Sequence, residues 1–184
     1  MSRAYRCLVA DDHPALVAAV SDFLERQGFD VVGRSRDGVA AVANVKETKP
    51  DIALVDYRMP HLGGVELLEQ IREAAPDTLI AVYTADTDQS IVGAVFDAGA
   101  HALILKDAPL ADLAQALRTI CAGQRYVDPA LAQVMLNGHE FVACQARAAG
   151  IVSSRTATVS PRSPLPTTWL GSQIPCRSPR LQGA

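Results

Sequence analysis

Paired cysteines, long apolar runs and an excess of positive charge are all missing from this sequence of 184 residues. Its four cysteines lack the short spacings of a zinc site or a disulfide framework, which indicates reduced thiols. No apolar run is long enough to cross a membrane, and the first residues lack the pattern of a signal peptide. We therefore expect a soluble protein in the cytoplasm, with no membrane partner.

The chain also has little net charge, and its acidic residues and lysines are unevenly distributed. A net charge of −3 and a pI near 5.8 give no general attraction to nucleic acid, so DNA contact would need a local basic segment. From His139 to Ala184 there is one acid, Glu140, and no lysine, whereas five arginines and five prolines stand among serines and threonines. This composition predicts a low-complexity, largely disordered tail over residues 139–184.

Short apolar strands alternate with amphipathic helices before that tail. The strands are expected at residues 5–10, 30–34, 52–55, 79–83 and 102–105, and the helices at about 14–27, 38–49, 65–74, 91–98 and 109–122. Asp128 and Pro129 predict the cap and first turn of a further helix that runs to Leu136. The alternation predicts an α/β fold with a five-stranded parallel sheet in the flavodoxin-like, doubly wound order 2-1-3-4-5, covered by helices on both faces.

Polar residues stand where four of these strands end. Asp11 and Asp12 follow the first strand, Asp56 follows the third, Thr84 the fourth and Lys106 the fifth. Because the carboxyl ends of parallel strands meet at one edge, we expect these side chains to surround one crevice. Three clustered carboxylates would repel one another without a cation, and oxygen ligands without histidine or cysteine favour Mg²⁺.

Each of these residues also has a simple structural explanation when it is taken alone. Asp12 suits a helix cap, Thr84 a strand end, and Lys106 a solvated surface position, while His13 suits an exposed loop. A carboxylate beside a divalent ion is also a nucleophile toward phosphorus. Because all four strand ends carry such residues in the right order, we favour a phosphoryl-transfer site over four unrelated coincidences.

Together these residues resemble the receiver domains of two-component response regulators. The resemblance covers residues 5–122, and further stretches up to Pro129 are similar to the NarL/FixJ (LuxR-type) subfamily, whose members usually continue into a helix-turn-helix domain. The motifs that carry it are Asp11-Asp12, Asp56 with Met59-Pro60 and Gly64, Thr84-Ala85, Gly99-Ala100 and Lys106, with Leu105-Lys106-Asp107-Ala108 and Tyr126-Val127-Asp128-Pro129 for the subfamily.

The resemblance implies a role for each of these residues. Asp56 would accept a phosphoryl group from a sensor histidine kinase, and Thr84 and Lys106 would contact the transferred group. Asp11, Asp12, Asp56 and the backbone carbonyl of Arg58 would hold Mg²⁺. Phosphorylation would switch a surface made of the fourth helix, fifth strand and fifth helix, through which such receivers commonly form homodimers. The domain would be regulatory rather than an enzyme, although it would support its own phosphotransfer and dephosphorylation.

One position departs from the resemblance. Receivers commonly carry an aromatic residue three positions before the lysine, whereas this chain has Leu103. Phosphorylation would then remain intact while its coupling to output is weakened or rerouted. A phosphohydrolase of the haloacid-dehalogenase type is disfavoured, because the second aspartate it requires is replaced by Arg58.

The expected organisation is a receiver domain at residues 1–122, a linker helix at 123–138 and the tail at 139–184. The prolines from Pro161 onward would interrupt the second helix of a helix-turn-helix domain, so DNA binding is doubtful for this chain. We hypothesise that the tail is an out-of-frame translation of a helix-turn-helix gene. The alternative is a receiver-only signalling module that acts through binding to other proteins.

Overall fold

The computed structural model describes residues 4–86, 88 and 90–136. The predictions for the tail at 139–184, and the end of the linker at 137–138, lie outside these residues. In the described part of the chain, every helix is too short or too polar to cross a lipid bilayer.

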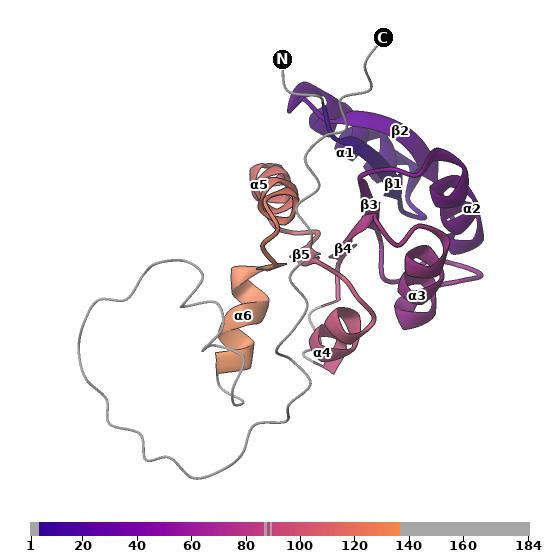
Figure 1. The fold of residues 1–184 in the computed structure, drawn as a ribbon. Helices are drawn as coiled ribbons and strands as arrows, with labels where there is room; N and C mark the ends of the chain where they lie inside the picture. The colour runs from indigo at the N-terminus through magenta and orange to yellow at the C-terminus, as the bar shows by residue number, and fades with distance from the viewer. Residues whose placement is uncertain (1–3, 87, 89, 137–184) are drawn as a thin grey trace.

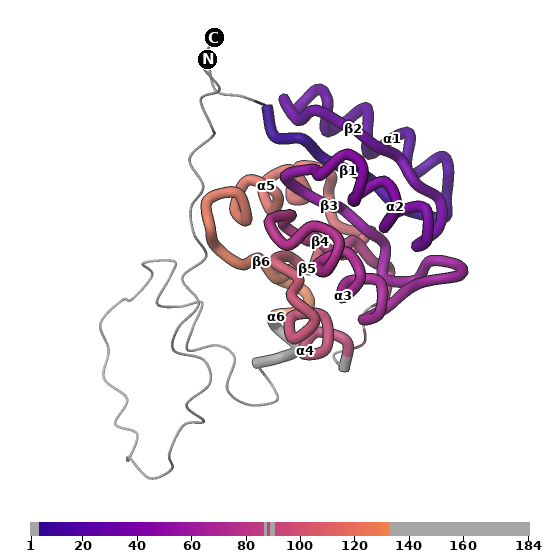
Figure 2. Tube along the Cα trace, turned by 45° about the vertical axis from the view of Figure 1, so that its right-hand side comes forward, coloured from indigo at the N-terminus to yellow at the C-terminus, as the bar shows by residue number. Residues whose placement is uncertain are grey.

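Six parallel strands form one sheet in the order β2-β1-β3-β4-β5-β6, which confirms the predicted order 2-1-3-4-5 and extends it (Figures 1 and 2). Each strand is short, and the central ones are buried on both faces, as expected of a parallel sheet covered by helices. The strands are β1 (Arg6–Ala10), β2 (Asp30–Ser35), β3 (Ile52–Val55), β4 (Leu79–Thr84), β5 (Ala102–Leu105) and β6 (Tyr126–Val127).

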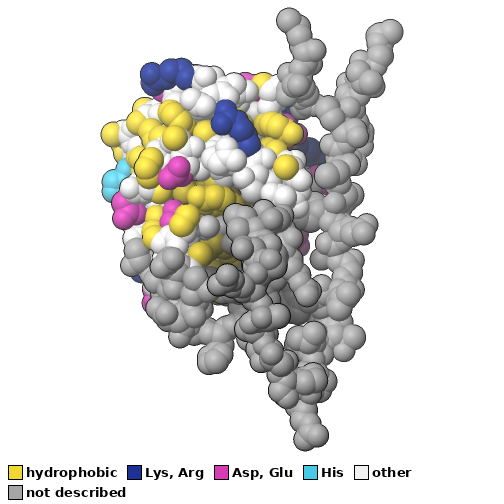
Figure 3. Space-filling view, turned by 90° about the vertical axis from the view of Figure 1, so that its left-hand side faces the viewer, with side chains coloured by type: hydrophobic (Ala, Val, Ile, Leu, Met, Phe, Trp, Pro, Cys, Tyr) yellow, Lys and Arg dark blue, Asp and Glu magenta, His cyan; other side chains and the backbone are white. Residues whose placement is uncertain are grey.

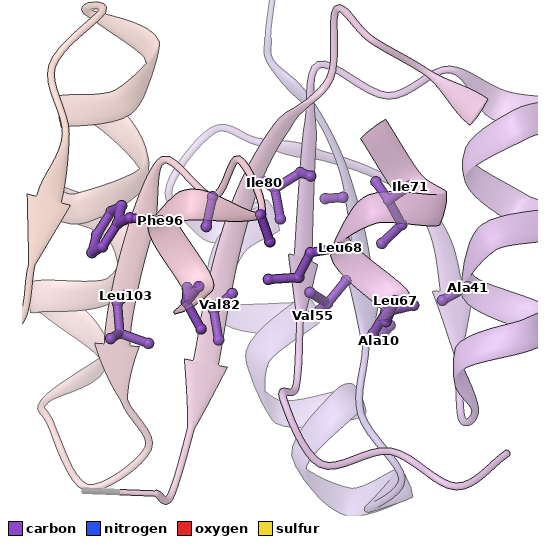
Figure 4. Close-up of a cluster of buried hydrophobic side chains, with 14 of the residues drawn as sticks. Ala10, Ala41, Val55, Leu67, Leu68, Ile71, Ile80, Val82, Phe96 and Leu103 are labelled. Carbon is purple, nitrogen blue, oxygen red and sulfur yellow. The ribbon is translucent and has the colours of Figure 1, made fainter. Parts of the chain in front are cut away.

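Helices cover both faces of the sheet because successive strand residues point to opposite sides. In β3, Ala53 and Val55 pack beneath α2, α3 and α4, while Ile52 and Leu54 pack against α1 and α5. Figure 4 shows part of the first of these two hydrophobic clusters. The helices are α1 (Pro14–Arg26), α2 (Gly38–Thr48), α3 (Gly64–Ala74), α4 (Ser90–Asp97), α5 (Leu110–Cys121) and α6 (Pro129–Leu136).

The sixth strand corrects the predicted strand count, because the sheet was expected to have five strands. Tyr126 and Val127 pair with the outer edge of β5, opposite Ala102 and Leu103. Two residues are too few for an alternating pattern to stand out from a linker sequence. The sheet therefore reaches beyond residue 122, and the linker joins it before α6 begins.

His101 is expected to make the stability of the fold depend on pH. Its Nδ1 accepts the Ile80 N–H at 3.1 Å, which requires the neutral ring, and burial, followed by the charge of Arg125, lowers its pKa. The unfolded chain therefore takes up the proton first below about pH 6.5, so we expect stability to fall as the pH falls. His101→Asn keeps an acceptor oxygen without titrating, and urea unfolding should show a shallower loss of stability between about pH 7.5 and 5.5. An unchanged slope would assign the acid sensitivity to other groups.

Candidate functional site

Backbone hydrogen bonds carry three of the predicted site residues to one edge of the sheet. The Asp56 N–H donates to the Ala10 carbonyl at 2.9 Å, and the Lys106 N–H donates to the Thr84 carbonyl at 2.8 Å. In the same way, the Asp11 N–H donates to the Ser35 carbonyl at the end of β2, at 3.1 Å. Each of these residues lies one position beyond the end of its strand and continues the hydrogen bonding to the neighbouring strand. Their side chains therefore lie side by side at the carboxyl edge of the sheet.

Lys106 lies between two carboxylates at this edge. Its Nζ is 2.6 Å from Asp11 Oδ2 and 2.8 Å from Asp56 Oδ2. The side chains of both aspartates are 4% exposed, and that of Lys106 is 14% exposed. The structure therefore brings these three predicted residues into direct contact, in a place where charges are poorly screened by water.

Burial and charge pairing oppose each other in this cluster. Burial raises the pKa of Asp56, and this effect exceeds the lowering caused by the Lys106 ammonium and by the Arg58 N–H. Burial also opposes the charge of Lys106, but the contacts with Asp11 and Asp56 outweigh it and raise the pKa of the lysine. The ammonium is therefore firmly charged, while the Asp56 carboxylate is a stronger base than an exposed one.

Asp12 lies on the solvent side of the cluster beside His13. The imidazole Nδ1 is 2.6 Å from Asp12 Oδ1 and 3.3 Å from Asp11 Oδ1, although the His13 side chain is 71% exposed. One ligand atom from each of these three residues lies within 4.8 Å of the others. Within this group, Asp11 and Asp12 could offer carboxylate oxygens to a metal ion, which are ligands of the kind that Mg²⁺ prefers.

Thr84 and Arg58 meet at the mouth of the site through Asp86. The Thr84 hydroxyl accepts the Asp86 N–H at 3.0 Å, and the Arg58 guanidinium forms an ion pair with the Asp86 carboxylate. The Arg58 N–H also donates to Asp56 Oδ1 at 3.2 Å. Hydrogen bonding to Arg58 holds the pKa of Asp86 below its usual value. The sequence offered no signal for this ion pair, because the two residues lie 28 positions apart.

Gly38 keeps the loop that follows Asp56 in place. A Cβ atom on this glycine would lie 1.8 Å from the Leu62 carbonyl oxygen, so the start of α2 and the loop are in close backbone contact. We expect Gly38→Ala to destabilise the fold by about 3 kcal/mol, because backbone atoms have to move. Gly93→Ala is the matched control: no atom lies near its Cβ position in α4, so alanine should stabilise the helix by about 0.5–1 kcal/mol. Equal free energies of unfolding for both variants would contradict this interpretation.

Comparison with known proteins gives one consistent result. The chain matches the response regulator receiver domain family over residues 7–118. The response regulator GacA of Pseudomonas viridiflava is 34% identical over 129 residues, which cover 70% of this chain and 60% of GacA. The oxygen regulatory protein NreC of Staphylococcus aureus is 36% identical over 139 residues, which cover 74% of this chain and 63% of NreC. The chain therefore spans less than two thirds of the length of these curated relatives.

Solved structures agree with these relatives. A LuxR-family two-component response regulator from Aurantimonas is 31% identical with a TM-score of 0.70, covering 73% of this chain and 96% of that one. The signal receiver domain of the putative response regulator NarL from Mycobacterium tuberculosis is 31% identical with a TM-score of 0.64, covering 67% and 100%. The family match covers more than half of the chain and includes Asp11, Asp56, Thr84 and Lys106. The chain therefore belongs to the family of response regulator receiver domains of two-component systems.

Proposed function

We propose that Asp56 is the phosphoacceptor of this receiver and that a sensor histidine kinase is its phosphodonor. The observation that carries this proposal is the contact of the Asp56 carboxylate with Lys106, beside Asp11, at the carboxyl edge of the sheet. An Asp56 oxygen attacks phosphorus, the bond from phosphorus to the donor nitrogen breaks, and an acyl phosphate forms while the histidine keeps the electron pair. Water later hydrolyses the acyl phosphate and restores the carboxylate.

Asp11, Asp12 and Asp56 would hold Mg²⁺, together with the backbone carbonyl of Arg58. The ion would neutralise the negative charge of the incoming phosphoryl group. The chain itself supplies a positive charge from Lys106 and a hydroxyl donor from Thr84. Because the Thr84 hydroxyl also accepts the Asp86 N–H, a shift of this hydroxyl toward the phosphoryl oxygens would disturb the Arg58–Asp86 ion pair.

The direct experiment is incubation of the chain with a small phosphodonor and Mg²⁺, followed by intact-mass measurement. We expect the addition of one phosphoryl group, which is lost when hydroxylamine cleaves the acyl phosphate. Omission of Mg²⁺ or addition of a chelator should reduce labelling strongly, because three acidic groups then face the incoming anion. A label that resists hydroxylamine would place the phosphoryl group on another kind of residue.

Homodimer formation through α4, β5 and α5 is a further part of the proposal. In this structure β6 pairs along β5, so such a dimer would contact β6 as well as β5 itself. Figure 3 views the molecule from the left-hand side of Figure 1, where α5 and α6 lie, and shows hydrophobic side chains gathered on that face. In α5 and β6, Leu110, Cys121 and Tyr126 are half-buried, which suits contact with a protein.

The output of the receiver has two candidate forms. The subfamily resemblance and the LuxR-family structure favour control of transcription, whereas the composition of residues 139–184 favours a receiver-only module that binds other proteins in the cytoplasm. Sequencing the gene from the Leu136 codon and translating all three frames separates the two. A frame that encodes two amphipathic helices around a short turn would support a damaged transcription factor, and its repaired chain should bind DNA.

A further inference from the structure

Asp128 lies where β6 ends and α6 begins, and it makes four hydrogen bonds. Its N–H donates to the Leu103 carbonyl at 2.8 Å, and its carbonyl accepts the Ala132 N–H at 2.9 Å. Its carboxylate uses both oxygens: Oδ2 accepts the Leu105 N–H at 3.3 Å and Oδ1 accepts the Ala130 N–H at 2.9 Å. Two of these bonds go to β5 and two go to α6, so one residue joins the strand to the linker helix.

The carboxylate replaces a backbone acceptor. If β6 continued, the regular parallel pairing would direct the Leu105 N–H to the Asp128 carbonyl. Because α6 begins at Pro129, that carbonyl instead accepts the Ala132 N–H. The side chain supplies the missing acceptor and is buried, with the residue 5% exposed. Helix capping alone would require only one of the two carboxylate bonds.

Leu105 is the residue immediately before Lys106. On its other side the end of β5 is held by β4, through the Lys106 N–H to the Thr84 carbonyl at 2.8 Å and the Tyr83 hydroxyl to the Lys106 carbonyl at 3.4 Å. The end of β5, at Leu105 and Lys106, therefore lies between the acidic site and α6. Backbone movement at Lys106 would reach the Leu105 N–H, which bonds Asp128, through a single residue.

Apolar contacts hold α6 against the same end of the sheet. Leu131 is buried in the hydrophobic cluster that contains Phe96, Leu103 and Leu105. Figure 4 shows Phe96 and Leu103 in this part of the cluster. Leu103, the position where an aromatic residue was expected from the resemblance, is completely buried. A leucine fixed in the core is poorly suited to swing between two positions, so the signal needs another route out of the site.

We propose that Asp128 is a positioning residue that ties α6 to the end of β5, so that movement of Lys106 toward a phosphoryl group loosens the linker helix. The tie stands on the observed contacts, whereas its trigger rests on the proposed function of Asp56. The Leu105 bond, at 3.3 Å, is the longest of the four hydrogen bonds of Asp128 and is therefore the first of these four to break when the strand end moves. Loss of that bond lets the carboxylate turn and weakens the cap of α6.

Amide hydrogen exchange in the unphosphorylated chain tests the tie between α6 and β5. Two substitutions are compared that remove different hydrogen bonds of the Asp128 side chain. Asp128→Ala removes both side-chain bonds, whereas Asp128→Ser keeps a short helix cap and cannot replace the carboxylate at Leu105. Exchange at the Leu105 amide should rise about fivefold or more in both variants, and exchange at the Ala130 amide should rise only in the alanine variant. Asp112→Ser, which removes an exposed carboxylate from α5, should change neither amide. Unchanged exchange at Leu105 in the serine variant would overturn the tie.

The second half of the proposal is the relay, in which movement at Lys106 loosens α6. It is tested by repeating the exchange measurement after addition of Mg²⁺ and beryllofluoride, which imitates a phosphoryl group. In a separate experiment, intact mass after treatment with a small phosphodonor reports whether Asp56 is labelled. In the wild-type chain, exchange across α6 should rise on addition, and in Asp128→Ser this response should disappear while Asp56 is still labelled. An equal response in both chains would overturn the relay. If the wild-type chain takes up no label, the proposed function and the relay fall together, whereas the tie is still decided by the unphosphorylated chain.

Discussion

Asp56→Ala is expected to reduce phosphoryl labelling by a small phosphodonor and Mg²⁺ to background. The substitution removes the carboxylate at the end of β3 that accepts the Arg58 N–H and contacts Lys106. Asp11 remains beside the same ammonium, but it would serve the metal rather than the phosphorus. The measurement is intact mass over time at saturating phosphodonor, followed by peptide mapping of any product.

Asp107→Ala is the matched control for this substitution. Asp107 follows Lys106 directly and is exposed, and it has no contact with either carboxylate of the cluster among the interactions of the described residues. Its variant should label at the wild-type rate. Labelling of the Asp56→Ala chain at a wild-type rate would remove Asp56 from its assigned role, and mapping would identify the acceptor.

The sequence predicted the strand order because it depends on features that are local and repeated. Runs such as Ile52–Val55 are apolar on both faces, and each is followed by a helix with one apolar face, so only a parallel sheet covered on both sides buries them. β6 was missed for the opposite reason. Its two residues form a strand only because the β5 edge beside them is free to pair, which is a tertiary effect.

The site was predictable to the extent that topology alone determines it. Asp11, Asp56 and Lys106 were placed together from their positions at strand ends, and the structure joins them within hydrogen-bond distance. The contacts of His13 with the two aspartates and the pairing of Arg58 with Asp86 depend instead on side-chain directions in loops. Asp128 was predicted as a helix cap, and its Ala130 bond confirms this, but its bond to Leu105 required the sixth strand.

Lys106→Met is expected to lower the free energy of unfolding by about 3 kcal/mol at neutral pH, because it leaves two buried carboxylates without their cation. Lys46→Met, on the exposed surface of α2, should change it by less than about 0.5 kcal/mol. Urea unfolding followed by circular dichroism measures both. Burial already raises the pKa of Asp56 in the folded chain, and loss of the Lys106 ammonium raises it further, so stability should recover as the pH falls and this carboxylate is protonated.

A second substitution makes this prediction sharper, because its sign depends on the lysine. In the wild-type chain, Asp11→Asn removes a favourable contact with Lys106 and should destabilise the fold by about 1 kcal/mol or more. In the Lys106→Met chain the same change removes the repulsion between Asp11 and Asp56, so it should stabilise the fold. The asparagine retains an oxygen for the His13 N–H, which Asp11 Oδ1 accepts at 2.9 Å, so the loop remains anchored in both backgrounds. A destabilisation of equal size in both chains would mean that Lys106 does not hold the two carboxylates together, and the electrostatic account of the site would fail.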